Sequence, residues 1–472
     1  MFRSPTRWSR AAKLQFSESA KKALKDLTES SKTAELFLKF DAGGEWRGLF
    51  VADGIETFAL HGGLRKAFEG ALKAREGETV RLTLTGLTPE NQARALAGFA
   101  SLTLLCAWKP DRYGKKTKPG AKTVARVEVV TDLPDADVKS ITREALALAE
   151  GNNLVRTLGQ APSNVLNPAS YRKQIETRAK QRKYKVDFYD RIDLTKLGAG
   201  AFLAVTQGSL EDEGGIVHLH VPGKGKAKKK LVLVGKGLCF DTGGYNIKTG
   251  AYMHGMHKDM LGSAIALAIF ETIVAMDWDL EVHAYLALAE NLISHRAYRP
   301  NDVVTALDGT TIEVVDTDAE GRMVLSDTLA LARKQKPDLL IDFATLTGSA
   351  IRALDTRRCA VFSPDAELAS LAYQVGEACG ERTWVFPMGD DFKEGLKSEI
   401  ADLLQCSHGP NADHSYAATF LHHFAGAETP WLHLDLTAAN NKGGLGLVSS
   451  ETTGIGVRWG YEVAKRYFKD VT

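Results

Sequence analysis

The second half of the chain alternates between short apolar runs and longer amphipathic stretches. The stretches at 259–276 and 320–333 carry apolar residues at helical spacing, and they are separated by strand-like runs. This alternation is typical of a mostly parallel sheet covered by helices on both faces. The predicted strands are Lys185–Tyr189, Gly215–Val221, Leu231–Val234, Leu280–Ala287, Ile312–Val315, Leu339–Phe343, Cys359–Phe362 and Trp431–Leu436.

The first part of the chain predicts a smaller α/β domain. A long helical pattern at 135–158 follows it and ends in the turn-rich segment 159–168. We therefore predict an N-terminal α/β domain at 1–134, an interdomain helix and linker at 135–165, and a larger C-terminal domain at 166–472. The N-terminal pattern consists of strands at 34–40, 48–52, 79–84 and 124–130 and helices at 63–73 and 89–107.

Composition narrows the class of protein only a little. The 60 basic residues balance 58 acidic ones, so no global field points to nucleic acid or to a membrane. Five scattered cysteines without a CxxC pair fit a reducing compartment and argue against a cysteine zinc site. We find no run of roughly 20 apolar residues and no secretory h-region. These features predict a cytoplasmic protein that does not interact with membranes.

The densest candidate chemistry lies in DTDAEGR at 316–322, between a predicted buried strand and a helix. Ligands of α/β sheets bind at the carboxyl ends of strands, so the three acids here are candidates for a site. A helix cap is the alternative explanation for any single acid. Three acids and an arginine beside apolar strands cost free energy unless a cation compensates them.

A second charged group follows the predicted strand at 231–234 on a glycine-rich connection. Carboxylates from both groups suit a pair of divalent cations, because their oxygens can bridge two metals about 3.5 to 4 Å apart. A lysine joins such a site once the cation's field removes its proton. A salt-bridge network of the same residues is the structural alternative. The candidates are Lys236, Asp241, Lys248, Asp259, Asp318, Glu320 and Arg322.

Other signals are weaker. The GKG at 235–237 lacks the GxxxxGKS/T pattern of a phosphate-binding loop. His218 and His220 share one face of a predicted strand, which indicates a packed and hydrogen-bonded pair. Cys239 has no evident activating base, and no G-x-S-x-G nucleophile elbow is present. The basic segments 109–122 and 224–230 are interpreted as solvated loops.

The two charged groups resemble the leucyl aminopeptidase family of cytosolic, two-metal exopeptidases. The resemblance is close in four ordered segments and looser over the rest of 163–472. These segments are VGKGLCFDTGGYNIK (234–248), KDM (258–260), DTDAEGRMVLSDTLA (316–330) and DFATLTGS (342–349).

The resemblance implies that five side chains hold two divalent ions, Mn²⁺ or Zn²⁺. It also implies that Lys248 polarises the scissile carbonyl and that Arg322 holds a bicarbonate that acts as general base. The implied ligands are Lys236, Asp241, Asp259, Asp318 and Glu320, with Asp241 and Glu320 bridging the ions.

The implied reaction removes N-terminal residues from short peptides with a water activated by the two metals. Met256, Thr345 and Gly348 match positions that line the pocket for the first side chain, so a Leu-like or Met-like residue should fit. The family's homohexamer is implied as well.

Two positions depart from the family pattern. Asp316 stands where the family has Asn, and GPNADHSYAATF at 409–420 replaces a more glycine-rich loop. These departures leave a catalytically impaired metal-binding scaffold as an alternative. A DNA-binding regulatory role is a further alternative, for which the segments 109–122 and 224–230 would supply the positive charge.

Overall fold

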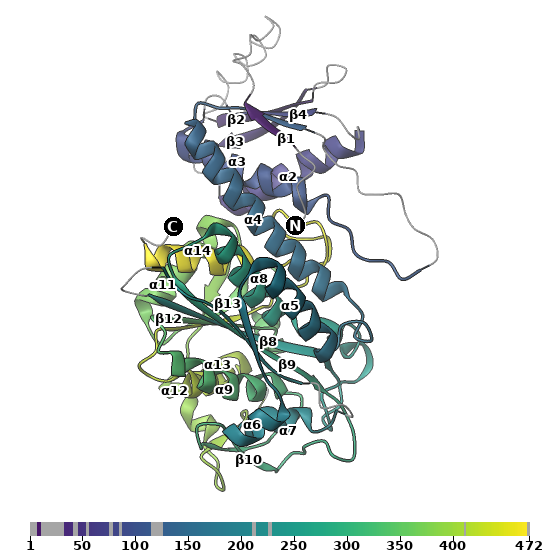
Figure 1. The fold of residues 1–472 in the computed structure, drawn as a ribbon, viewed down its shortest axis with the longest axis vertical. Coiled ribbons are helices and arrows are strands. Elements are labelled where there is room, and N and C mark those ends of the chain that lie inside the picture. Colours follow the sequence, from purple (N-terminus) through teal and green to yellow (C-terminus); the bar gives the residue numbers. More distant parts are fainter. Residues whose placement is uncertain are drawn as a thin grey trace, which may run out of the picture. The chain divides into compact units, whose positions relative to one another are not determined.

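The computed structural model consists of two compact units, each with its own sheet (Figure 1). The first unit contains Met1–Asn153, Glu377–Gly380 and Lys442–Glu451, and the rest of the chain forms the second. The division falls inside the long helix, whereas the sequence-based boundaries lie on either side of it at 135 and 165. The structure describes residues 7–10, 33–40, 46–52, 56–74, 79–84, 87–114, 126–209, 214–224, 229–409 and 412–469.

The first unit is a mixed α/β layer. Its described strands form a five-stranded sheet in the order β1-β5-β4-β2-β3, in which β5 pairs in parallel with both β1 and β4. Phe68 and Phe99 meet edge to face in the core between two of the helices. The elements are β1 (Arg7–Arg10), β2 (Thr33–Phe40), β3 (Trp46–Ala52), α2 (Thr57–Ala74), β4 (Thr79–Thr83), α3 (Pro89–Leu105), β5 (Arg126–Val130) and α4 (Asp135–Gln160).

The second unit is built on an eight-stranded sheet in the order β14-β13-β16-β12-β8-β9-β7-β6. Its central strands β16, β12, β8 and β9 are parallel, and antiparallel pairs flank them on both sides. The predicted fold class, with a mostly parallel sheet flanked by helices, is therefore confirmed. The strands are β6 (Lys185–Tyr189), β7 (Gly215–Val221), β8 (Lys230–Asp241), β9 (Glu281–Asn291), β12 (Leu339–Ala344), β13 (Cys359–Phe362), β14 (Thr383–Val385) and β16 (Trp431–Asp435).

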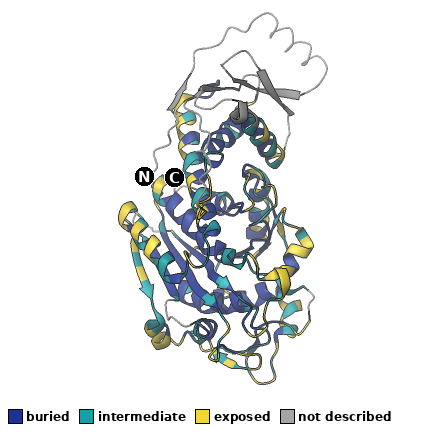
Figure 2. Ribbon diagram, turned by 90° about the vertical axis from the view of Figure 1, so that its right-hand side faces the viewer, coloured by how far each residue is buried: buried dark blue, intermediate teal, exposed yellow. Residues whose placement is uncertain are grey.

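Helices cover both faces of this sheet (Figure 1). On one face α8 (Leu261–Met276) packs on β8, with α5 (Pro168–Arg182) and α14 (Val457–Phe468) against it. On the other face α9 (Glu320–Ala332) packs between the sheet and the two helices α7 (Gly200–Thr206) and α13 (Asp413–Ala425). The dark interior of Figure 2 follows these helices and the central strands. The helices α8 and α9 thus enclose β8 between them.

One helical stretch, 250–276, is long and apolar enough to cross a membrane by length and composition. The expectation that no stretch reaches this length is therefore wrong. However, 83% of its most apolar window is buried inside the protein, because α8 contacts protein on all sides. A helix that is hydrophobic all round is typical of the core of a large domain.

Three predicted strands differ clearly from the observed ones, and one of them, predicted to end at Ala287, continues as β9 to Asn291. β8 runs on to Asp241, so Lys236 lies inside this strand and not on a connection after it. Gly235 allows this, since a Cβ there would lie 2.5 Å from Ser263 Cα of α8. The predicted strand Ile312–Val315 shrinks to β11 (Thr311–Glu313) and joins a separate sheet with β10 (Val303–Thr305) and β15 (Leu403–Leu404). Part of each basic segment, 109–122 and 224–230, lies outside the described residues.

Candidate active site

The carboxyl ends of the central parallel strands bring the candidate residues together. Asp241 and Asn291 are the last residues of β8 and β9, Thr345 directly follows β12, and Asp435 ends β16. Ligands bind at this edge in open α/β sheets because connecting loops and helix ends converge there. The order of the strands therefore places the candidate residues where ligands of such sheets bind.

Lys236 is the centre of the first half of the cluster. Its Nζ lies 2.9 Å from Asp259 Oδ2 and 2.9 Å from Glu320 Oε1, and it donates a hydrogen bond to the Thr345 carbonyl at 3.0 Å. Gly321, at the start of α9, makes this approach possible, since a Cβ there would lie 2.7 Å from Lys236 Nζ. The glycine after Glu320 is thus required for contact between the strand and the helix.

Lys248 is the centre of the second half. Its Nζ lies 2.8 Å from Asp241 Oδ2 and 2.5 Å from Asp318 Oδ1. The other oxygen of Asp241 accepts hydrogen bonds from the Gly243 amide at 2.8 Å and from Asn291 Nδ2 at 2.9 Å. Gly243 has a φ of +84°, a conformation that favours glycine. These contacts orient Asp241 toward the lysine.

The acidic turn that carries Asp318 is held by a buried amide. Gln405 Oε1 accepts hydrogen bonds from the amides of Val315 and Asp316, and its Nε2 donates one to the Ala319 carbonyl. Asp316 Oδ1 accepts the amide of Asp318 at 2.8 Å. An asparagine at position 316 has the same acceptor oxygen, so the aspartate retains the bond that shapes this turn.

Three carboxyl groups of this cluster, those of Asp259, Asp318 and Glu320, resist ionisation in the absence of further cations. Burial raises the pKa of Asp259 to about 6 and that of Asp318 and Glu320 to about 7, with neighbouring carboxylates adding to the shift. Burial alone would lower the pKa of Lys236 and Lys248, but the surrounding carboxylates raise it above its ordinary value. The site is therefore short of positive charge.

The arrangement fits divalent cations. One oxygen from each of Asp241, Asp259 and Glu320 lies within 4.8 Å of the others, a spacing from which three ligands can reach one ion. Glu320 Oε2 is buried and has no hydrogen-bond partner among the described residues. The carboxylates of the cluster face only two ammonium groups, and one of their buried oxygens has no partner among the described residues. Both observations favour bound cations over a closed salt-bridge network.

The predicted pocket residues come from two segments that follow β8 and β12 in the chain. Met256 is half-buried in the short helix η2 (Met256–Lys258), which packs on β8. Gly348 is exposed at the start of α10 (Gly348–Leu354). The Thr345 hydroxyl donates a hydrogen bond to Asp259 Oδ1 at 2.6 Å, so this residue also orients a candidate ligand.

Arg322 is placed differently from the other candidates. It is buried on α9, and its Nη2 lies 2.8 Å from Asp413 Oδ1 at the start of α13. Sequence reasoning did not single out Asp413, although it noted the unusual loop in which this residue lies.

Three further contributors were not predicted. Asn291 orients Asp241, Gln405 holds the acidic turn, and Asp435 accepts hydrogen bonds from the Leu346 amide and the Thr347 hydroxyl. Asp435 is an acid near the end of the predicted strand Trp431–Leu436, which is a usable signal, whereas Asn291 lies beyond the predicted end of its strand at Ala287. Gln405 has no such signal, because its partners are backbone groups almost ninety positions earlier in the chain.

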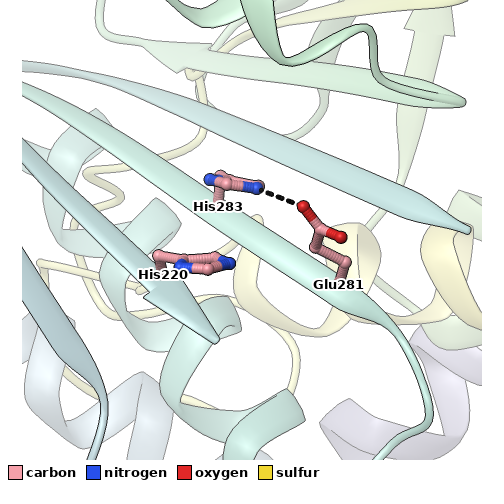
Figure 3. A group of neighbouring side chains, drawn as sticks. All are labelled: His220, Glu281 and His283. Atoms are coloured by element: carbon pink, nitrogen blue, oxygen red, sulfur yellow. Dashed lines mark hydrogen bonds and ion pairs between the residues drawn. The ribbon is translucent and has the colours of Figure 1, made fainter. Parts of the chain in front are cut away.

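A second cluster lies on β7 and β9, away from the strand ends just described (Figure 3). The ring of His283 makes hydrogen bonds to Glu281 at 3.1 Å and to His218 at 2.8 Å. His220 stacks on His283 with an interplanar angle of 14°, and one ligand atom from each of His220, Glu281 and His283 lies within 4.8 Å of the others. The prediction that His218 is a packed, hydrogen-bonded residue is confirmed, and we interpret the cluster as structural.

We expect this cluster to make the protein less stable as the pH falls from about 6.5 towards 4. Burial lowers the pKa of His218 to about 3 and that of His283 to about 4. The unfolded chain therefore binds more protons in this window, and each pKa unit of difference is worth about 1.4 kcal/mol. Thermal unfolding between pH 4 and 7.5 should show a shallower loss for the His218→Asn/His283→Asn double variant. Equal slopes for both proteins would contradict this explanation.

A mostly parallel sheet with carboxylates and lysines at its carboxyl edge defines an α/β protein with a candidate metal site at that edge. Residues 153–460 match the catalytic domain of the cytosol aminopeptidase family. A protein from Parasynechococcus marenigrum (strain WH8102), named probable cytosol aminopeptidase, is 39% identical over 84% of this chain and 81% of its own length. A similarly named protein from Stutzerimonas stutzeri (strain A1501) is 40% identical over 68% of this chain and 64% of its own length.

The fold agrees with these sequence matches. The crystal structure of a cytosol aminopeptidase from Coxiella burnetii superposes with a TM-score of 0.74, at 31% identity, over 85% of this chain and 84% of that one. The chain belongs to the cytosol aminopeptidase family, and it is therefore a peptidase of the hydrolase class. The predicted family is confirmed.

Proposed function

We propose that this peptidase removes N-terminal residues, preferably Leu-like or Met-like ones, from short peptides with the help of two divalent metal ions. The observation that carries the proposal is the convergence of Asp241, Asp259 and Glu320 within 4.8 Å at the carboxyl edge of the sheet. Lys236 and Lys248 join these acids to one another and to Asp318.

Each candidate ligand has a role in this proposal. Lys236, Asp259, Asp241 and Glu320 would hold one ion, and Asp241, Glu320 and Asp318 the other. Bound there, the two ions would supply a site for the α-amino group of the substrate and acidify a water molecule. Lys236 can be a ligand only as the free amine, so we expect ion binding to release protons and to strengthen as the pH rises.

Lys248 is proposed to donate a hydrogen bond to the carbonyl oxygen of the scissile bond. Its ammonium group is held by Asp241 and Asp318, and 15% of its side chain is exposed, which leaves it accessible to a substrate. Met256, Thr345 and Gly348 are proposed to contact the first side chain of the substrate. The space beside Gly348 is open to a substrate side chain, because a Cβ built on this residue has only the end of Arg352 nearby, at 3.6 Å.

The test is an assay of leucyl amide and methionyl amide hydrolysis by the full chain, after removal of metals and after addition of Mn²⁺ or Zn²⁺. We expect activity with at least one of these ions, its loss on chelation, and its return when the ion is restored. An aspartyl amide is the matched control substrate and should be cleaved more slowly. Absence of turnover with both ions would contradict the proposal.

The alternatives are less well supported. Asp316 accepts the hydrogen bond from the Asp318 amide, so the turn is preserved although the family has Asn at this position. A catalytically impaired scaffold would be expected to lose this turn. No comparison favours a DNA-binding role. The homohexamer and the cytoplasmic location stay proposals, supported by membership of a family whose members are named cytosol aminopeptidases.

A further inference from the structure

The guanidinium group of Arg322 already has an anionic partner from its own chain. Both carboxylate oxygens of Asp413 contact Arg322 Nη2, at 2.8 and 3.0 Å. Nη1 is 3.4 Å from the Gln405 carbonyl. The side chain of Arg322 is 2% exposed and that of Asp413 is 30% exposed, so the carboxylate is the partner nearer to solvent.

The segment that carries Asp413 is anchored by the residue that follows it. Asp413 lies in the first turn of α13, where the helix dipole favours a negative charge. The amide of the next residue, His414, donates a hydrogen bond to Ser349 Oγ at 2.9 Å, and the His414 ring Nδ1 lies 2.9 Å from the same hydroxyl. Since Ser349 is in α10, beside the proposed pocket, Asp413 is held in place independently of Arg322.

This arrangement does not fit the bicarbonate that the family resemblance implies. A planar carboxylate with one negative charge already occupies Nη2, and the positive charge of Arg322 is neutralised. Nε is buried and lacks a hydrogen-bond partner among the described residues, but a single N–H cannot bind an oxyanion in the bidentate manner typical of arginine. A second anion would also meet the charge of Asp413 at close range.

We propose that Asp413 is the resident anion of Arg322 in this protein and takes the place of bicarbonate. It acts as a positioning residue, since it neutralises Arg322 and fixes the guanidinium beside the helix turn that carries Glu320. The proposal rests on the proposed function only in assigning Arg322 to the active site. Two consequences follow: the wild-type protein neither binds nor needs bicarbonate, and removal of the carboxylate creates a bicarbonate site at Nε and Nη2.

The first experiment measures binding without turnover. Bicarbonate is titrated calorimetrically into the metal-loaded full chain in carbonate-free buffer. We expect no binding to the wild type, binding to the Asp413→Gly variant, and no binding to the Asp413→Gly/Arg322→Met variant, which serves as the matched control. Binding to the wild type that Arg322→Met abolishes would overturn the proposal. So would an Asp413→Gly variant that folds, by circular dichroism, yet binds no bicarbonate.

The second experiment measures leucyl amide hydrolysis in the same buffers. The wild-type rate should not change with bicarbonate, whereas Asp413→Gly should lose about a hundredfold and recover most of it when bicarbonate is added. A wild-type rate that rises with bicarbonate would overturn the proposal. If Asp413→Gly does not fold, the wild-type titration and rate decide the question. Failure of every preparation to cleave amides would count against the proposed function, while the binding titration still tests the role of Asp413.

Discussion

Replacing Lys248 by alanine should lower the rate of leucyl amide hydrolysis by about 10²- to 10³-fold, the loss typical of removing one donor to a developing oxyanion. The ammonium group lies 2.8 Å from Asp241 and 2.5 Å from Asp318, so it is directly beside two proposed ligands. It is not itself a proposed ligand, unlike the carboxylates that lie within 4.8 Å of one another. Metal content should stay close to the wild-type value, because the proposed carboxylate ligands remain.

The measurement is kcat and KM together with metal content by mass spectrometry, in a buffer that contains Mn²⁺. We expect the loss mainly in kcat, since the bond to the carbonyl oxygen strengthens as negative charge develops. Lys224→Ala is the matched control, because Lys224 is more than half exposed in the same unit and pairs with Asp277. Full activity of Lys248→Ala, or a loss of metal equal to its loss of rate, would contradict the role proposed for Lys248.

Replacing Glu320 by glutamine should have a still larger effect, because it removes a proposed bridging ligand. We expect the rate to fall by more than about a thousandfold and at least one ion to be lost. Glu320 is almost fully buried, contacts Lys236 and belongs to the three-carboxylate group. Glutamine keeps the size of the side chain, so the change isolates the negative charge. The matched control is Glu394→Gln, whose carboxylate is exposed and pairs with Lys397.

The stability of the metal-free Glu320→Gln variant separates a metal site from a salt-bridge network. Burial and the neighbouring Asp241 raise the pKa of Glu320 to about 7, so the folded state binds more protons than the unfolded state between about pH 4.5 and 7. Ionised Glu320 therefore destabilises the metal-free protein above pH 7. At pH 8 the metal-free variant should melt no lower than the metal-free wild type, and added Mn²⁺ should stabilise the wild type far more. A large drop in melting temperature without metal would favour the network.

Much of the fold could be read from local pattern. The strands at 185–189, 215–221 and 359–362 match their predicted bounds, because the first two alternate apolar and polar residues, the third is a short apolar run, and polar or turn residues bound all three. The prediction for β8 stopped early at Gly235, since a lysine between two glycines normally ends a buried strand. In this fold Lys236 is tolerated there because Asp259 and Glu320 compensate its charge from other segments.

The site residues also fall into a group that the sequence predicted and a group that it did not. Residues on recognisable motifs, such as Asp241, Lys248 and Glu320, were predicted from the sequence, and the structure brings them into contact. The residues that hold them were not, because Gln405 and Asn291 act through hydrogen bonds to segments far away in the chain. A single amide in a loop carries no periodicity or motif, so only the folded arrangement gives it a role.

The sequence by itself was sufficient to predict the fold class, through periodicity, and the family, through four segments that resemble it. It also singled out the acids and lysines that the structure brings together. Only the tertiary structure determined which residue pairs with Arg322. Nothing in the spacing of Arg322 and Asp413, 91 positions apart, indicates that α9 and α13 place a carboxylate on the guanidinium. The energy of such an ion pair depends on distance and burial, and both arise only when the helices pack against the sheet.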